Sequence, residues 1–237
     1  MKRLIDTLLR TATVERVEPL AGRFRAITLT LTGAGIRDLE VKPGQQIRVQ
    51  AGAANPVVDL LVGALRTYSI WEYDRTRMEL RIFDHGEGPG AQWARRVRPG
   101  EEVSVFGPEG SFVTRPSSYH LFAGDETAAV AFGAMIRGLD DGAPVHAAIE
   151  VDTEQDQLPI PGEVTWIHRN GRSAVKSADL VVAVANLDLP ETPGTAYLAG
   201  EAGTIQMVRE HLVRDRGWHR RNVVTKPFWA PGRTGMD

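Results

Sequence analysis

The first half of the chain alternates apolar and polar residues in several short runs. In residues 25–32, Ile27, Leu29 and Leu31 recur at every second position, which is the period of a strand with one buried face. Similar runs predict five further strands, at 11–17, 46–50, 66–72, 78–84 and 101–106. A single helix is expected before the last of these strands. Six strands in this arrangement predict a small antiparallel barrel.

The second half of the chain alternates apolar strands with helices. Helices are expected at 126–139 and 204–216, and Asp125 is the residue expected to cap the first of them. The runs that predict strands are 119–123, 144–151, 164–168, 196–199 and 222–226. This alternation predicts a parallel sheet in an α/β domain that binds a nucleotide.

Two segments determine where the predicted domain boundary lies and which elements the second half contains. Residues 114–118 are polar and contain a proline, as linkers do, so the predicted domains are 1–115 and 116–237. The apolar run within 179–189 has the local propensity of a strand, but tertiary context overrides propensity in runs this short. From the residues alone, this segment stays open between strand and helix.

The composition excludes several classes of function. The chain has no cysteine, so it has no disulfide, no cysteine-ligated iron–sulfur cluster and no cysteine nucleophile. Any electron transfer would therefore need a bound organic cofactor. The six histidines show no paired ligand spacing, so we expect no dedicated metal site.

Charge and hydropathy bear on partners and location. The net charge is −2, and no apolar run approaches the ~20 residues that span a bilayer, so we expect neither nucleic acid nor membrane as a partner. Residues 1–10 carry Asp6 and Thr7 among their leucines and lack the apolar stretch of a secretory signal. We therefore expect a cytoplasmic protein.

The predicted strand at 66–72 begins with a cation, an aromatic ring and hydroxyl groups. Side chains two residues apart share a face, so Arg66 and Tyr68 project the same way, about 6–7 Å apart along the strand. The Arg66 guanidinium suits a pyrophosphate, the Tyr68 ring suits a flat conjugated system, and Ser69 can hydrogen-bond ring nitrogens. The alternative is an exposed arginine and a half-buried tyrosine on an ordinary barrel strand.

The next predicted strand ends in a glycine-rich turn that opens a helix. Residues 84–90 read Asp-His-Gly-Glu-Gly-Pro-Gly, and Pro89 suits the first helical position, where a missing N–H group costs nothing. Unpaired N–H groups and the partial positive charge at a helix N-terminus favour a phosphate. The alternative is a tight turn in which the glycines serve geometry only.

Together these motifs resemble the siderophore-interacting protein family. The pattern is Arg-x-Tyr-Ser, then His-Gly-x-Gly-Pro-x-x-x-Trp-Ala, then Pro-Gly-x-x-Val-x-x-x-Gly-Pro, and the resemblance continues through residues 124–128, 198–201 and 226–232. Members of this family are flavin-containing ferric-siderophore reductases of the ferredoxin-reductase superfamily. The resemblance implies a flavin-binding barrel followed by a nicotinamide-binding α/β domain, and it implies a helix at 179–189.

The resemblance also implies which residues form the sites. Those expected to bind FAD are Arg66, Thr67, Tyr68, Ser69, Asp84, His85, Gly86, Gly90, Ala91, Trp93, Thr127 and Trp229. Those expected beside the nicotinamide of NADPH or NADH are Asp125, Glu126, Thr127 and Glu201. Those expected beside a ferric siderophore, which is often anionic, are Lys226 and Arg233, with Lys42 as a weaker candidate.

Structural alternatives accompany these assignments. The acids Asp125 and Glu201 can simply initiate helices, since carboxylates favour helix N-termini. Trp229 can pack in a core, and a lysine at a strand end is often solvated. Arg169 and Arg172 flank Gly171 after a predicted strand; they can hold a ribose phosphate, but a solvated basic loop is the preferred interpretation.

The function that the resemblance implies is the transfer of electrons from NADPH or NADH through flavin to siderophore-bound iron. Because the cofactor carries this chemistry, no catalytic acid or base is expected. We also expect a monomer. Two departures bear on the acceptor: Ala230 stands where the family commonly has arginine, and Arg81 stands where it often has an acid. A flavin reductase with another acceptor, or a flavin-loaded sensor or binding protein, stays open.

Overall fold

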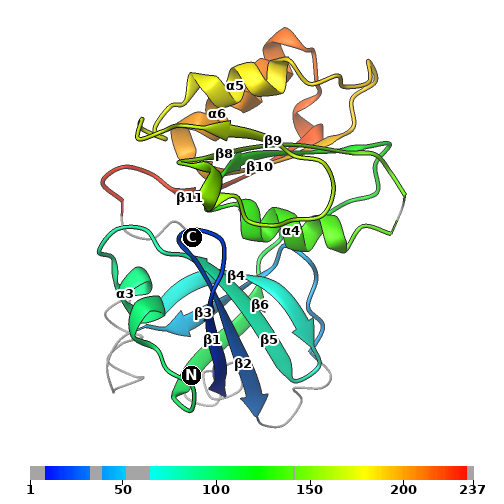
Figure 1. Cartoon of the computed structure of the whole chain (residues 1–237). Coiled ribbons are helices and arrows are strands. Elements are labelled where there is room, and N and C mark those ends of the chain that lie inside the picture. The colour runs from blue at the N-terminus through cyan, green and yellow to red at the C-terminus, as the bar shows by residue number, and fades with distance from the viewer. Residues whose placement is uncertain (1–8, 33–38, 52–64, 141, 234–237) are drawn as a thin grey trace. The chain divides into compact units, whose positions relative to one another are not determined.

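The computed structural model describes residues 9–32, 39–51, 65–140 and 142–233. Contacts within the chain define two compact units, Met1–Val113 and Thr114–Asp237 (Figure 1). Residues 1–8, which carry most of the segment expected to lack a secretory signal, lie outside the described residues. Among the described residues, no helix combines the length and the apolar character that crossing a membrane requires.

The first unit is the predicted antiparallel barrel, closed in the order β1-β2-β5-β4-β3-β6. Its strands are β1 (Leu9–Pro19), β2 (Phe24–Thr32), β3 (Gln46–Gln50), β4 (Leu65–Asp74), β5 (Arg77–Phe83) and β6 (Glu102–Glu109). Ile27 and Leu29 of β2 lie opposite Leu80 and Met78 of β5, and all four are fully buried. The period of two in the sequence therefore places one face of each strand in the barrel core.

Among the described residues of this unit there is one helix, and it comes before the last strand as predicted. Helix α3 (Pro89–Arg96) starts with Pro89 in its first turn and ends at the C-cap Val97. Its side chains Trp93 and Ala94, together with Val97, belong to the barrel core. The polar face of α3 is thus turned away from the barrel, and its first turn follows directly on the glycine-rich segment.

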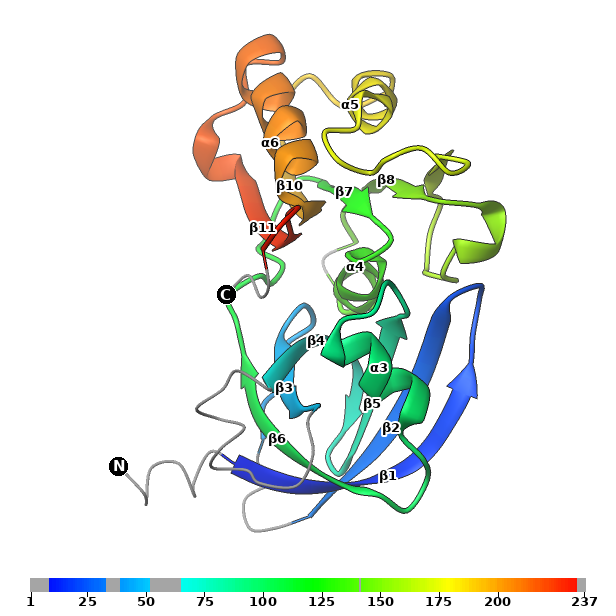
Figure 2. The ribbon, with the colours of Figure 1, turned by 90° about the vertical axis from the view of Figure 1, so that its left-hand side faces the viewer.

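The second unit is the predicted parallel sheet, with strand order β11-β10-β7-β8-β9. Its strands are β7 (His120–Asp125), β8 (Val145–Val151), β9 (Thr165–His168), β10 (Thr195–Glu201) and β11 (Val223–Trp229). Figure 2 shows α5 (Ala178–Ala185) and α6 (Ala202–Glu210) on one face of this sheet and α4 (Ala129–Arg137) on the other. The fold class, a β-barrel unit followed by an α/β unit, is therefore confirmed.

The ambiguous segment 179–189 contains all but the first residue of helix α5, as the resemblance implied. Leu180 and Val184 are fully buried and pack with Ile205 and Val208 of α6. These pairs are spaced by four and three residues, so a helix brings each pair to one face. Tertiary packing against α6 therefore overrides the strand propensity of the valine-rich run.

Two expected helix boundaries are wrong by three residues or more. Helix α4 begins at Ala129 rather than 126, and its N-cap is Ala128, not Asp125. The Asp125 carboxylate instead accepts hydrogen bonds from Thr127 in the turn before α4 and from residues of β10 and β11. The helix expected to continue to 216 ends at Glu210, where a π-helical turn over His211–Asp215 replaces it.

Candidate functional site

In the barrel, the two predicted flavin motifs lie against each other. A Cβ atom on Gly90 of α3 would lie 2.9 Å from the Tyr68 hydroxyl oxygen and 3.5 Å from Arg66 Cγ. The Tyr68 hydroxyl donates a hydrogen bond to the Gly90 carbonyl oxygen at 3.1 Å. Arg66 and Tyr68 therefore share one face of β4, as their spacing predicted, and that face meets the first turn of α3. Glycine is needed at position 90 because any side chain would displace Tyr68.

The Tyr68 ring is held by aromatic packing. Its centroid is 5.5 Å from that of Trp93, and the planes are tilted by 33°. Burial raises the pKa of the Tyr68 phenol, and the nearby Arg66 charge opposes this only in part, so the phenol is a neutral hydrogen-bond donor. Trp93 itself is 6% exposed and lies in the barrel core. It is thus placed to support Tyr68 rather than to offer a free ring face.

The turn that precedes α3 is held by Arg95. Its guanidinium Nε lies 2.9 Å from both carboxylate oxygens of Asp84, and Nη2 donates to the Gly86 carbonyl oxygen at 2.7 Å. The hydrogen bond to Asp84 is the main cause that raises the pKa of Arg95. Asp84 therefore shapes the turn. Gly86 adopts a φ of +64°, which favours glycine.

The first turn of α3 is suited to an anion. It contains no acidic residue, and its N-cap Gly88 gives no side-chain hydrogen bond to it among the described residues. A Cβ atom on Gly86 or Gly88 would meet nothing within 4 Å among those residues, so space remains beside this turn. Helix N–H groups without a cap, next to Arg66, form a donor set that fits a phosphate.

The remaining barrel candidates occupy varied positions. Thr67 is exposed, and Ser69 is 8% exposed in its pairing with β3. His85 is exposed and stacks on Phe83 with centroids 5.8 Å apart. Ala91 is buried, so only its backbone can reach a ligand.

The substrate candidate Lys42 also lies in this unit. It is exposed, and its backbone N–H group donates to Gln45 Oε1 at 2.8 Å. Whether each of these barrel residues contacts a cofactor or substrate stays a prediction.

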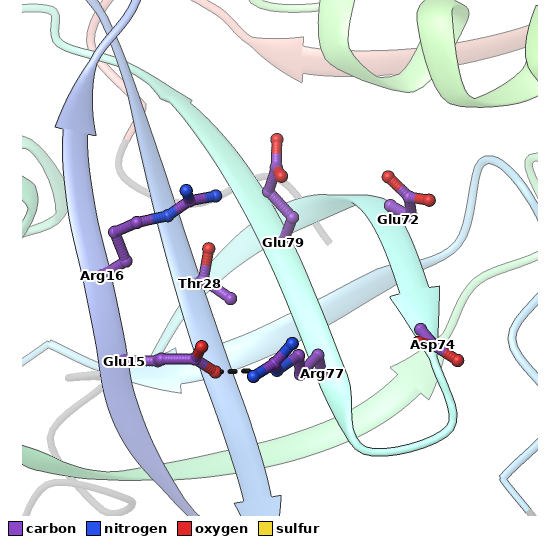
Figure 3. A pocket seen from close by; sticks show the side chains of 7 residues that line it. All are labelled: Glu15, Arg16, Thr28, Glu72, Asp74, Arg77 and Glu79. Carbon is purple, nitrogen blue, oxygen red and sulfur yellow. Dashed lines mark ion pairs between the residues drawn. The ribbon is translucent and has the colours of Figure 1, made fainter.

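The barrel also carries a charged hollow of about 280 Å³ that contains none of the predicted site residues (Figure 3). It is lined by Glu15, Arg16, Thr28, Glu72, Asp74, Arg77 and Glu79. Figure 3 shows these side chains over β1, β2, β4 and β5, where Glu15 pairs with Arg77 at 3.0 Å. Most of the charged side chains that line the hollow form ion pairs or are exposed to solvent. The hollow also offers no flat apolar wall against which a conjugated ring could stack.

In the α/β unit, polar side chains gather at the carboxyl ends of the strands. This is the edge where open α/β sheets bind ligands. Asp125 ends β7, Glu150 lies one residue before the end of β8, Arg169 follows β9 and Glu201 ends β10. All four are at least 94% buried. The predicted nicotinamide residues are thus brought to one edge, together with two residues that were not assigned to this site.

The Asp125 carboxylate accepts hydrogen bonds from three different residues. Its Oδ2 atom accepts from the Glu201 backbone N–H at 2.7 Å and from the Trp229 indole N–H at 2.9 Å. Its Oδ1 atom accepts from the Thr127 backbone N–H at 2.9 Å. Burial, followed by the neighbouring Glu126 charge, raises the pKa of Asp125 to about 6 although these hydrogen bonds oppose the rise.

Glu126 forms a buried ion pair with Arg169. The two guanidinium Nη atoms donate to the two carboxylate oxygens at 2.7 and 2.5 Å, and both side chains are 7% exposed. The interpretation of Arg169 as part of a solvated basic loop is therefore wrong, whereas Arg172 is exposed and pairs with Asp179 at 2.6 Å. A buried arginine that is engaged in this way is not free to bind a ribose phosphate.

Glu150 completes the buried cluster. Arg169 Nη1 lies 3.6 Å from Glu150 Oε2, and the Ser177 hydroxyl donates to Glu150 Oε1 at 2.5 Å. Burial is the largest cause that raises the pKa of Glu150, against the opposing effects of Ser177 and Arg169. Sequence reasoning missed Glu150 and Ser177. The available signal was a single acid inside the apolar run 147–151, because an acid in a buried strand needs a partner.

Glu201 caps helix α6. Its carboxylate accepts from the Gly203 and Thr204 backbone N–H groups at 2.9 and 2.7 Å. Burial favours a higher pKa for Glu201, but hydrogen bonds from Gly203, Lys176 and Thr204 outweigh it and lower the pKa overall. The helix-initiating role weighed for Glu201 is confirmed. A role beside the nicotinamide stays a prediction.

The substrate candidates lie on and after the edge strand β11. Lys226 is half-buried opposite Ala199 of β10, and Arg233 is exposed four residues after the end of the strand. Trp229, the last residue of β11, is half-buried and hydrogen-bonded to Asp125. The structure therefore places Lys226 and Trp229 on one strand, and their ligand contacts stay predictions.

Comparisons with known proteins cover both units. Residues 117–232 match the sequence model described as siderophore-interacting protein, and residues 60–112 match that described as siderophore-interacting FAD-binding domain. Ferric vibriobactin reductase ViuB of Vibrio cholerae serotype O1 is 28% identical over 178 residues, or 71% of this chain. The aligned part of this chain spans 65% of the length of ViuB.

Solved structures support the same assignment. A siderophore utilization protein from T. fusca has a TM-score of 0.81 at 24% identity, covering 97% of this chain and 95% of that chain. The siderophore-interacting protein SipS from Aeromonas hydrophila has a TM-score of 0.76 at 26% identity, covering 96% and 93% of the two chains. The implied ferredoxin-reductase-like fold is confirmed, since a ferredoxin reductase shares it. The chain belongs to the siderophore-interacting protein family.

Proposed function

We propose that this protein is a FAD-dependent reductase that passes electrons from NADPH or NADH to the iron of a ferric siderophore. The observation that carries the proposal is the meeting of Arg66 and Tyr68 with the first turn of α3 at Gly90, within the FAD-binding match. The reaction would release Fe(II) in the cytoplasm, and the protein would act as a monomer. The matched relative ViuB, a ferric vibriobactin reductase, supports the choice of substrate class.

The residues of the barrel fit FAD. Arg66 and the uncapped N–H groups of α3 would hold the pyrophosphate, because charge-assisted hydrogen bonds to phosphate are the strongest that such groups make. Tyr68, kept neutral and supported by Trp93, would present its polar edge and ring to the isoalloxazine, with Thr67 and Ser69 beside it. FAD, when bound, supplies the redox chemistry by accepting a hydride and giving single electrons.

In the α/β unit, we assign the nicotinamide to the carboxyl edge of the sheet, beside Thr127 and Glu201. Asp125 and Glu126 keep their carboxylates satisfied by hydrogen bonds and by Arg169, so they shape this edge rather than act as an acid or base in the reaction. No residue here needs to act as acid or base, since the task of the protein is to fix the geometry of the reacting groups.

We assign the ferric siderophore to the cationic side chains of Lys226 and Arg233. Ferric siderophores are often anionic, and a positive charge raises the local concentration of an anionic substrate. Fe(II) is a softer and weaker partner than Fe(III) for hard oxygen ligands, so reduction favours release. The replacement of arginine by Ala230 removes one cation from this end of the chain.

The test is the visible spectrum of the purified protein under nitrogen. A yellow protein that bleaches with NADPH or NADH, and recovers its colour when a ferric siderophore and an Fe(II) chelator are added, would support the whole proposal. Bleaching without Fe(II) formation would replace the siderophore by another acceptor, and a yellow protein that does not bleach would be a flavin-binding sensor. A colourless protein that FAD cannot reconstitute would refute the proposal.

A further inference from the structure

The Asp125 carboxylate connects three neighbouring strands of the parallel sheet. It lies at the end of β7, and its Oδ2 atom accepts from the Glu201 N–H of β10 at 2.7 Å and the Trp229 indole of β11 at 2.9 Å. Strand β10 lies between β7 and β11, so the carboxylate reaches across a whole strand. Trp229 is half-buried and is the last residue of the edge strand β11.

Gly200 makes this reach possible. A Cβ atom on Gly200 would lie 2.6 Å from Asp125 Oδ2 and 2.7 Å from Asp125 Cγ, closer than real Cβ contacts allow. Gly200 also has a φ of +123°, a conformation that other residues rarely adopt. The carboxylate therefore passes over β10 at the one position where that strand has no side chain.

The pairing of β10 with β11 changes the direction in which the Trp229 side chain projects. Gly200 is opposite Pro227, but the next residue, Glu201, is opposite Trp229, so Phe228 is an extra residue in β11. Such bulges turn the following side chain relative to the regular alternation of a strand. Pro227 is tolerated because β11 is an edge strand of this sheet. The bulge and Gly200 together bring the Trp229 indole N–H to the Asp125 carboxylate.

We infer that Asp125 is a positioning residue for Trp229, and that the carboxylate fixes the orientation of the indole at the carboxyl edge of the sheet. The use of Trp229 beside FAD rests on the proposed function, whereas the hydrogen bond and its consequences do not. Loss of the negative charge on Asp125 weakens a charge-assisted hydrogen bond to a neutral one and frees the indole. The orientation of Trp229 therefore depends on the protonation of Asp125.

The charges around Asp125 set the pH of this change. Those that face it are Glu126 in the following turn, Glu150 on β8, Arg169 after β9 and Glu201, whose N–H group is also a donor. Burial and the Glu126 charge raise the pKa of Asp125 to about 6, which is a pH at which folded proteins can be studied in solution. Removal of the Glu126 charge would lower this value, because one negative charge near Asp125 is lost.

The first test follows the indole N–H resonances of the ¹⁵N-labelled full chain, which has five tryptophans. Trp229→Phe identifies the Trp229 peak by its loss. In the wild type we expect this peak to shift with a midpoint near pH 6. In Asp125→Asn the shift should vanish, and in Glu126→Gln its midpoint should fall. A Trp229 peak that ignores pH in the wild type would overturn the inference, and so would a shift that persists in Asp125→Asn.

The second test asks whether Asp125 acts on the reaction through Trp229. The rate of FAD reduction by NADPH or NADH is measured for Asp125→Asn, Trp229→Phe and the double variant. If Asp125 works by orienting Trp229, its substitution changes the rate in the wild type by about twofold or more but not in the Trp229→Phe background. Equal effects in both backgrounds would overturn the inference. A wild type that is not reduced at all would refute the proposed function instead, and the resonance shift would still decide the present inference.

Discussion

The buried ion pair between Arg169 and Glu126 predicts a large and specific loss of stability when the arginine charge is removed. Arg169→Met keeps most of the side-chain volume but leaves the carboxylates of Glu126 and Glu150 without a cation. Because Arg169 and Glu126 are each 7% exposed, water cannot replace the lost partner. Removal of one partner from a buried pair destabilises proteins by about 3–5 kcal/mol, and we expect a loss in this range.

The matched control lies three residues away. Arg172 also forms an ion pair, with Asp179 at 2.6 Å, but the two side chains are 63% and 44% exposed. Exposed pairs contribute about 0–1 kcal/mol, so Arg172→Met should change the free energy of unfolding very little. The two variants remove the same charge from the same loop, but one charge is buried between two carboxylates and the other is exposed beside one.

The assay is urea-induced unfolding at pH 8 and at pH 5, followed by circular dichroism. A carboxylate that has lost its buried partner can be neutralised by a proton, so the deficit of Arg169→Met should shrink as the pH falls. The double variant Glu126→Gln/Arg169→Met should recover part of the loss, because fewer uncompensated charges remain. If Arg169→Met and Arg172→Met both cost less than about 1 kcal/mol, the buried pair does not stabilise the unit as argued.

Three further predictions concern the proposed sites. Arg66→Ala should weaken FAD binding by roughly 1.5–3 kcal/mol in a titration of the apoprotein, while Arg96→Ala, an exposed change at the far end of α3, should leave it unchanged. Lys226→Ala should raise the KM for an anionic ferric siderophore without changing FAD content; an unaltered KM would remove Lys226 from the substrate site. Asp125 has a folded pKa of about 6 against 3.8, raised by burial and then by Glu126, so it disfavours the folded state as the pH rises from about 4 to 6, by roughly 3 kcal/mol in total. Relative to Asp125→Asn, the wild type should therefore lose stability over that range, and parallel pH profiles in urea unfolding would contradict the argument.

The parts of the fold that follow from local periodicity were predictable. Ile27, Leu29 and Leu31 recur with the period of a strand, and the structure buries all three in the barrel core. Pro89 marks the start of α3 for a steric reason that acts within one residue. The segment of α5 was ambiguous because valines suit both strands and buried helix faces, and only its packing against α6 decides the outcome.

The parts of the site that depend on contacts between distant residues were not predictable. Glu126 and Arg169 are separated by 43 positions, and polar neighbours made the loop around Arg169 look solvated. Asp125 was expected to serve the nearest helix, whereas two of its hydrogen-bond donors come from strands 76 and 104 positions later. In each case the residue type indicated that a partner was needed, but only the strand order of the sheet determines which partner is in reach.

The same strand order explains why the glycines of two distant motifs depend on each other. A Cβ atom on Gly124 of β7 would lie 1.9 Å from the Ala199 carbonyl oxygen of β10, and one on Gly200 would collide with Asp125. Each glycine therefore makes room for the motif that contains the other. A side chain at either position would force β7 and β10 apart or expel the Asp125 carboxylate, and the Trp229 indole would lose its acceptor in both cases. The Gly-Asp-Glu turn, the Ala-Gly-Glu turn and the terminal tryptophan thus form one structural unit, and a change in any of them should alter the environment of Trp229.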